Sequence, residues 1–278
     1  MAKGIGLIGN FRGKVGNMVG YNLKDSNNKQ TQGVRVYQPI VKNPKTYAQA
    51  EQRAKLAPIN ALYRALKPVI DRGQEGKAYG NKSRLAWLKQ ALINFNSPWI
   101  EKGASVVSAP LVPISHGSLA PVGIVSPTDG ACYLEFNEQT SAPTTMGALS
   151  TALLDYYPQL RNGDQITFVM VMKDIHGGMI PSIVSIVVDT ASTSAIPSDF
   201  SVTTSTLTWN LSDDNGIATS IILSREGSNG EHLRSSASLH KGYEYDDSKD
   251  SDAAKEAAIK SYMSGGSNTD WAEESLQG

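Results

Sequence analysis

Two glycine-rich runs near the N-terminus have a spacing that could bind phosphate. The run GIGLIG, residues 4–9, has the G-x-G-x-x-G spacing of a dinucleotide-binding loop, which needs a strand before it and a helix after it. Only three residues precede this run, and residues 11–13, Phe-Arg-Gly, stand where the helix should begin. The run GNFRGKV is one residue shorter than a Walker A loop, and Val15 replaces the hydroxyl that holds magnesium. We therefore predict no nucleotide cofactor.

Side chains that could ligate a metal or act as nucleophiles are scattered along the chain. None of the four histidines is spaced as a metal-binding pair or lies near Cys132, the single cysteine. Ser115 and Ser118 flank His116, but no G-x-S-x-G elbow or supporting acid accompanies them. The acidic residues 246–250 lack the glycine and terminal glutamate of a calcium loop. We predict no catalytic, cofactor-binding or metal-binding residues and do not expect an enzyme.

The overall composition is that of an ordinary globular protein. A chain of 278 residues with 40% hydrophobic and 19% charged residues can bury a sizeable core and commonly forms more than one domain. No apolar run approaches the length of a membrane span, and glycines interrupt the N-terminal apolar stretch, which argues against a signal peptide. A single cysteine indicates a reducing compartment, or a particle assembled in one.

The zero net charge hides a strong asymmetry. Residues 1–90 contain 17 Lys and Arg against 4 Asp and Glu, a net of +13, whereas residues 91–278 contain 9 against 22, a net of −13. A basic part of this kind can bind nucleic acid. Alternatively, the basic part of one copy faces the acidic part of the next in an oligomer. We favour the oligomer because the basic residues are spread along the predicted elements instead of forming one run.

The elements that would position these groups begin with a hairpin. Apolar and polar residues alternate loosely over residues 15–23 and 34–41, separated by the turn-forming run DSNNKQTQG. Gly13, Gly16 and Gly20 interrupt the first strand, where glycine typically marks a bulge, a bend or the close approach of another backbone. Because such a strand is weakly specified alone, we expect a partner from elsewhere in the structure, including another subunit.

Two helices are predicted after the hairpin. Thr46 and Gln49 form a T-x-x-Q capping box that opens the first, and Pro58 predicts a kink or break in it. A second helix is predicted from about residue 82 to residue 95. We expect Leu85, Leu88 and Leu92 to form its buried stripe, with Trp87 beside it, and the aromatic residues of this region to fill the seam between the helices instead of binding nucleic acid.

The second half of the chain reads as β structure. Strands are predicted over residues 132–136, 165–172 and 180–188, the last two joined by the hairpin turn DIHGG, and a short helix over residues 149–160. A three-strand meander is predicted over residues 201–239. This spacing indicates a β-sandwich of immunoglobulin-like design, followed by a solvated acidic tail with a short helix.

The predicted fold class is therefore α+β. We expect a basic hairpin and helical domain over residues 1–96, a proline-rich connector over 97–125, a β-sandwich domain over 126–242 and the acidic C-terminal tail over 243–278.

Four stretches together resemble a protein family found across Bacteroidetes genomes and in the phages that infect them. They are GNFRGKVGNMVGYNLKD, NPKTYAQAEQRAKLA, NKSRLAWLKQAL and SHGSLAP. The family pattern is a G-x-x-G-K-V-G hairpin, a T-x-x-Q-x-x-Q-R helix, a short helix and an S-R-G-S-L entry into β structure. This chain has His116 in place of the usual arginine and Tyr47 where proline is common. The likeness covers about the first 120 residues well and the remainder in outline.

What the resemblance implies is a structural protein of a tailed phage, including the crAss-like group. We expect a virion subunit of a portal-proximal ring, collar or tail, made in the host cytoplasm, whose partners are copies of itself in a cyclic homo-oligomer and other portal, ring or tail proteins. The alternatives are a nucleic-acid-binding protein using the basic N-terminal domain, and a bacterial surface or carbohydrate-binding module. The predicted interaction surface comprises Arg12, Lys14, Lys24, Arg35, Lys42 and the isolated aromatic Trp271.

Overall fold

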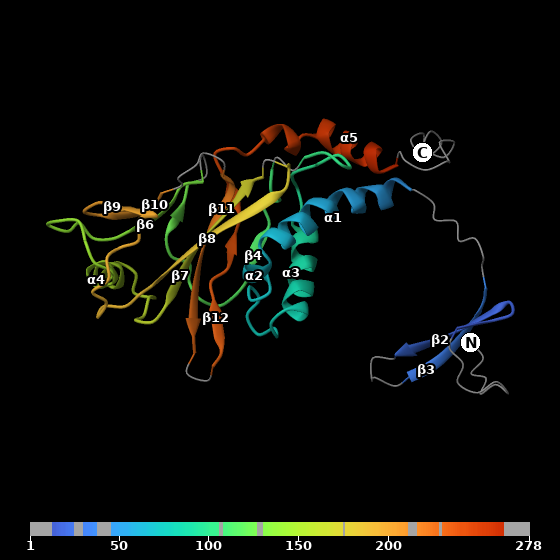
Figure 1. Cartoon of the computed structure of the whole chain (residues 1–278), viewed down its shortest axis with the longest axis horizontal. Coiled ribbons are helices and arrows are strands. Elements are labelled where there is room, and N and C mark those ends of the chain that lie inside the picture. The colour runs from blue at the N-terminus through green and yellow to red at the C-terminus, as the bar shows by residue number, and fades with distance from the viewer. Residues whose placement is uncertain are drawn as a thin grey trace. The chain divides into compact units, whose positions relative to one another are not determined.

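The fold combines five α-helices with several antiparallel sheets in the described part of the chain, which confirms the α+β class (Figure 1). The computed structural model describes residues 13–24, 30–37, 46–105, 108–126, 130–174, 176–210, 216–227 and 230–263. The chain divides into two compact units, residues 1–44 and 45–278. This division differs from the four segments expected from the sequence.

The first unit contains a three-stranded antiparallel sheet. Strands β1 (Gly13–Val15), β2 (Met18–Lys24) and β3 (Gln30–Val36) pair in the order β1-β2-β3. The predicted hairpin is confirmed as β2 and β3, although β3 begins earlier than expected. Gly16 does not interrupt a strand; its φ of 58° places it in the tight turn between β1 and β2, a backbone conformation that favours glycine.

Helix α1 (Tyr47–Ala65) opens the second unit. The Thr46 hydroxyl accepts a hydrogen bond from the Gln49 backbone N–H at 3.4 Å, which confirms Thr46 as the cap. The return hydrogen bond of a capping box is not formed, because the Gln49 Oε1 atom is buried without a partner among the described residues. The helix runs through Pro58 without a break, so the predicted interruption at this residue is wrong in that respect. Pro58 lies on the buried face with Ala54 and Leu62, and this packing holds the helix together across the missing N–H.

Two shorter helices follow, α2 (Lys67–Ile70) and α3 (Asn81–Ile93). The buried face of α3 carries Ser83, Trp87 and Ala91. Of the predicted leucine stripe, Leu88 and Leu92 are partly buried against the helical core, whereas Leu85 is 56% exposed, so the prediction is wrong for Leu85. Trp87 decides this orientation because its indole N–H donates to the Pro113 carbonyl at 2.8 Å. Of the four aromatics expected in the seam, Trp87 and Tyr63 pack together, while Tyr47 and Tyr79 are exposed.

The segment expected as a connector is folded into the unit. It carries the short strands β4 (Pro113–Ser115) and β5 (Ile124–Val125), and the side chains of Trp99, Ile100 and Val112 are buried. Its prolines therefore interrupt regular structure without releasing the chain into solvent.

The predicted acidic tail is also part of the fold as far as residue 263. A 3-10 turn, η1 (Asp247–Asp250), leads into α5 (Asp252–Met263), which packs against α1 and buries Ala258 and Ile259. Tyr245 is 9% exposed, and its hydroxyl donates to Asp250 Oδ1 at 2.7 Å. A segment that buries apolar side chains in this way is not a solvated tail.

A five-stranded antiparallel sheet forms the middle of the second unit. Its main path is β12 (His232–Arg234), β11 (Gly216–Glu226), β7 (Gln165–Lys173) and β8 (Met179–Val187), and β14 (His240–Lys241) also pairs with β11. The predicted strands and hairpin turn of β7 and β8 are confirmed. Strand β8 lies at the sheet edge and contains Pro181, opposite Val171.

A four-stranded sheet contains β5, β6 (Cys132–Glu135), β10 (Thr206–Trp209) and β9 (Phe200–Val202), in that order. The expected three-strand meander is therefore wrong, because β9 and β10 belong to this sheet whereas β11 and β12 belong to the other. A two-stranded pair of β4 and β13 (Ala237–Ser238) completes the β structure described.

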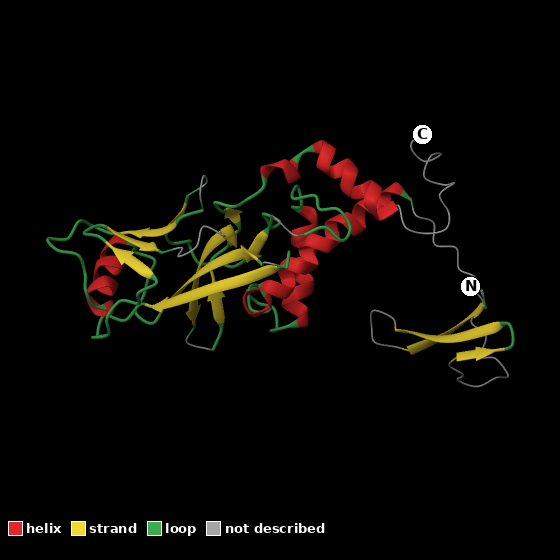
Figure 2. Cartoon of the chain, turned by 45° about the horizontal axis from the view of Figure 1, so that its top comes forward, coloured by secondary structure: helices red, strands yellow, loops and turns green. Residues whose placement is uncertain are grey.

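Two hydrophobic cores lie on opposite faces of the five-stranded sheet. Val169 and Val171 face a core formed with α1, α2, α3 and α5, whereas Phe168 and Met170 face a core formed with the four-stranded sheet and α4 (Met146–Tyr156). Figure 2 shows the helical group at one end of this unit and α4 with the smaller sheet at the other. The two sheets share a core, but an immunoglobulin-like sandwich is not confirmed, because α4 takes part in that core and helices cover the other face.

No helix in the described residues is long and apolar enough to cross a membrane.

Candidate functional site

The predicted interaction surface is described only in part. Lys14 and Arg35 lie on the three-stranded sheet with exposed side chains. Lys24 ends β2, but its side chain is outside the described features. Arg12, Lys42 and Trp271 lie outside the described residues.

One face of the three-stranded sheet is basic and aromatic. The register aligns Lys14 with Val19 and Val19 with Arg35, so these side chains share a face. The Lys14 ammonium lies 3.6 Å from the centre of the Tyr37 ring, a cation–π contact. Tyr21 lies over Gly33 on the same face, where an added Cβ would meet the ring at 2.7 Å. The glycine is therefore required for this contact.

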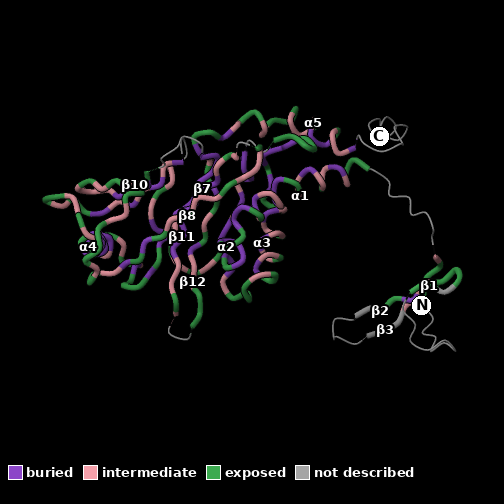
Figure 3. The backbone as a smooth tube through the Cα atoms, viewed as in Figure 1, coloured by how far each residue is buried: buried purple, intermediate pink, exposed green. Residues whose placement is uncertain are grey.

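The opposite face of that sheet is apolar, and its large described side chains are exposed. Met18 pairs with Val36, and Gly20 pairs with Val34, which places these residues together. The exposed fractions are 41% for Met18, 52% for Val34 and 70% for Val36. Figure 3 shows the described part of the sheet coloured mainly as exposed, in contrast to the buried strands of the second unit. Exposed apolar side chains gathered on one face are typical of an interaction surface.

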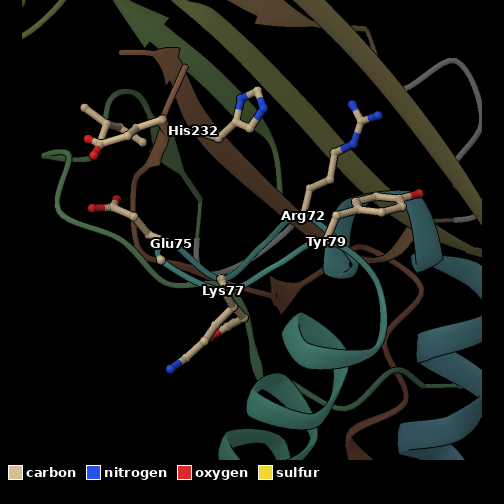
Figure 4. A pocket seen from close by; sticks show the side chains of 9 residues that line it. Arg72, Glu75, Lys77, Tyr79 and His232 are labelled. Carbon is tan, nitrogen blue, oxygen red and sulfur yellow. The ribbon is translucent and has the colours of Figure 1, made fainter. Parts of the chain in front are cut away.

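A pocket of about 590 Å³ lies within the second unit, between the loop that follows α2 and strand β12. Its lining residues are Arg72, Gln74, Glu75, Gly76, Lys77, Tyr79, Glu231, His232 and Leu233. In Figure 4 the Arg72 and Tyr79 side chains lie side by side, and the Arg72 guanidinium is 5.3 Å from the centre of the Tyr79 ring. The sequence placed these two segments in different domains.

Glu75 joins the two sides of the pocket. Its carboxylate accepts hydrogen bonds from the Ser118 N–H at 2.9 Å, the Ser118 hydroxyl at 2.7 Å and the Arg234 backbone N–H at 3.1 Å. Burial acts to raise the pKa of Glu75, but these hydrogen bonds outweigh it and hold the pKa below its ordinary value. Glu75 is therefore an ionised group with a positioning role.

Two buried hydrogen-bond donors, on Gln74 and Arg234, lack an acceptor among the described residues. Gln74 is 5% exposed and its side-chain Nε2 has no hydrogen-bond partner, and the same holds for the Nε of Arg234. Burial, together with the positive charge of Arg72, lowers the pKa of Arg234. Neither Arg72 nor Arg234 forms an ion pair with another described residue.

The described residues contain neither a paired nucleophile and base among His116, Ser115 and Ser118 nor a group of side chains that could hold a metal. Ser118 donates its hydroxyl proton to Glu75, while His116 Nδ1 lies 3.3 Å from the Ser236 hydroxyl, so His116 and Ser118 do not form a base and nucleophile pair. Burial raises the pKa of the Cys132 thiol to about 12, which keeps it protonated. Within the described ranges no group of three or more His, Cys, Asp or Glu could hold a metal.

The comparisons with known proteins return no match to a family model, a curated protein or a solved structure. The resemblance to the Bacteroidetes and phage family therefore stays a prediction from the sequence.

The composition of the loop DRGQEGK, residues 71–77, could have indicated a binding site, although no site was predicted there. It sets charged and amide side chains between two glycines in a connection between helices. What the sequence did not indicate was the strand that completes the pocket, about 155 residues further along.

Proposed function

We propose that this chain is a structural subunit of a multi-subunit assembly, attached to its neighbour through the three-stranded sheet. The observation that carries the proposal is the uncovered apolar face with Met18, Val34 and Val36. A two- or three-stranded sheet needs a covered hydrophobic face for independent stability. Docking against a neighbour supplies that cover.

The occupant of this face is the main unit of a second copy of the chain. Residues 1–44 contain seven Lys and Arg against one Asp, a net of +6, whereas the main unit, residues 45–278, contains 19 against 25, a net of −6. Opposite charges steer the two surfaces together, and the apolar side chains supply the buried contact. A contact between different surfaces of successive copies is heterologous, so it closes into a ring when the rotation permits.

The assembly is a ring, collar or tail component of a tailed phage virion, and its other partners are neighbouring portal or tail proteins. This assignment rests on the resemblance of the motifs in the first 120 residues to the Bacteroidetes and phage family, which is an argument by analogy. Mass spectrometry of purified virions tests it directly. Presence of the chain at a fixed multiple of the portal copy number is expected, and its absence from virions contradicts the assignment.

The association is tested by sedimentation velocity of the full chain at low salt, compared with the double substitution V34S/V36S. We expect the unmodified chain to form an oligomer and the double variant to sediment as a monomer, because two exposed valines leave the contact. The matched control is Ile93→Ser, which removes a 72% exposed apolar side chain from α3 in the other unit and leaves the oligomer intact. A full chain that remains monomeric at high concentration contradicts the proposal.

A second candidate function is nucleic-acid binding by the opposite face of the same sheet. Lys14 and Arg35 lie there beside Tyr21 and Tyr37, a combination that suits phosphates and stacked bases. Its test is binding of single-stranded DNA at two salt concentrations. Affinity that falls steeply with salt supports this function, and the absence of binding at low salt removes it.

A further inference from the structure

The pocket between the α2–α3 loop and β12 belongs to the second unit alone. Its walls come from residues 72–79 and 231–233, which the Glu75 hydrogen bonds to Ser118 and Arg234 hold together. The site is therefore built by fixed backbone segments and does not depend on the three-stranded sheet or on assembly.

The charges around this pocket are unequally compensated. The Glu75 carboxylate is already occupied by three donors. By contrast, Arg72, Lys77 and Arg234 form no ion pair with the described residues, and Arg72 and Arg234 are near enough for their positive charges to interact. The Glu231 carboxylate is exposed at the edge, where solvent screens its charge. The positive charge that lacks a counter-ion is therefore concentrated on the wall of the pocket that carries Arg72.

Two donors on the segments that form the pocket are buried without acceptors among the described residues. Gln74 lines the pocket, is 5% exposed and has no partner for its Nε2. The Arg234 Nε is likewise buried without a partner, although its strand neighbours His232 and Leu233 line the pocket. Buried donors are nearly always paired, and leaving them unpaired lowers the stability of the folded chain. An acceptor-rich anion at the Gln74 amide would satisfy the donor that lines the pocket.

We propose that this pocket binds a small phosphate-bearing molecule. The Arg72 guanidinium on the pocket wall offers planar donors that match phosphate oxygens, and Gln74 adds a neutral donor. Arg234 does not line the pocket, but its positive charge lies near enough to Arg72 to add to the field there. The exposed Tyr79 ring offers a surface on which an organic group attached to the phosphate can stack. A volume of about 590 Å³ exceeds the need of a phosphate alone and lies in the range of small-molecule sites.

The test is calorimetric titration of the full chain with adenosine monophosphate, inorganic phosphate and adenosine. We expect the nucleotide to bind more tightly than phosphate, and adenosine to bind least because it lacks the anion. Arg72→Gln and Arg234→Met are each expected to weaken nucleotide binding about tenfold, since each removes a charged hydrogen-bond donor. The matched control is Arg64→Gln on the exposed surface of α1, with binding within about twofold of the unmodified chain.

A second measurement keeps the proposal falsifiable if a variant folds poorly. Because the Arg234 Nε is unpaired, Arg234→Met is expected to raise the thermal midpoint of the ligand-free chain while reducing the increase that the nucleotide causes. The backbone hydrogen bonds of residue 234, to Glu75 and from Leu119, remain in this variant.

Three outcomes overturn the proposal. They are equal binding of adenosine and its monophosphate, undiminished nucleotide binding by both arginine variants, and a lower ligand-free midpoint for Arg234→Met with an unchanged nucleotide effect. Tighter binding of a short single-stranded DNA than of the nucleotide, lost in the same variants, would assign the pocket to a nucleic-acid backbone instead. The self-association measured by sedimentation is unaffected by any of these results, so this inference and the proposed function fail separately.

Discussion

The two sheet systems of this chain differ in what covers them. Strands β7 and β11 carry almost uninterrupted buried residues, with one core on each face of their sheet. The three-stranded sheet of the first unit exposes Val34 and Val36 on one face and Lys14 and Arg35 on the other. Both sheets are antiparallel, so the hydrogen-bond ladder does not explain the difference. A sheet that its own chain covers provides stability, and one left uncovered offers a surface to a partner.

The largest effect on stability is expected from the buried ion pair of the second unit. Arg225 donates to both carboxylate oxygens of Asp164, each at 2.6 Å, and Asp164 is 1% exposed. Asp164→Ala leaves a buried guanidinium uncompensated and should lower the free energy of unfolding by about 3 to 5 kcal/mol, measured by urea denaturation. Asp155→Ala, at an exposed position on α4, should change it by less than about 0.5 kcal/mol. Equal effects of the two would show that the pair is not integral.

A similar effect should follow in the helix that the sequence assigned to an acidic tail. Ile259 of α5 is fully buried in the helical core. Ile259→Ala should cost about 2 to 5 kcal/mol through lost burial and a cavity. Its neighbour Lys260 is exposed, so Lys260→Ala serves as the control, with a change below about 0.5 kcal/mol in the same denaturation experiment. An unchanged midpoint for the isoleucine variant would place α5 outside the cooperative unit.

A smaller effect is expected from pH. The folded-state pKa of Glu75 lies below its ordinary value of 4.5, so its contribution to stability is complete above that pH and is lost as the pH falls through the folded value. The thermal midpoint of the second unit should therefore fall in acid, and Glu75→Gln should make that fall shallower. Glu256→Gln, an exposed position on α5, should leave the slope as it is. Parallel acid profiles for all three proteins would contradict the role of Glu75.

The smallest effect on unfolding is expected in the first unit. V34S/V36S should change the thermal midpoint of the second unit by less than the error of calorimetry, because neither valine contributes to its cores. The same variant should abolish self-association, which would separate the two roles most clearly. A marked loss of stability in the second unit would show that the units are energetically coupled.

Signals that act over a few residues were correctly interpreted from the sequence. The Thr46 cap and the β7–β8 hairpin depend on neighbours in the chain and are confirmed. The buried face of α3 was predicted only in part, because leucine spacing placed Leu88 and Leu92 correctly but also Leu85, which is exposed. Its orientation depends on the hydrogen bond from Trp87 to the Pro113 carbonyl, which spacing along the helix does not reveal.

For the candidate sites too, features with a local sequence signal were predicted and features that depend on long-range contacts were not. The basic character of the first unit was evident from composition, and Lys14 and Arg35 do share a face. Its apolar face was not predicted, because β3 begins earlier than expected and the register that pairs Met18 with Val36 cannot be read from the alternation alone. The pocket was not predicted, since residues 72–79 meet β12 only through tertiary packing. Long-range contacts of this kind have no local signature in a single sequence.

Pro181 gives the edge strand β8 a protective role during synthesis. Proline has no N–H, so a foreign strand laid against this edge finds a missing donor, and the ladder between the two chains cannot be completed across it. Exposed Ile180 and Ile183 would otherwise make this edge prone to aggregation. An edge interrupted in this way is less able to pair with the edge strand of another chain.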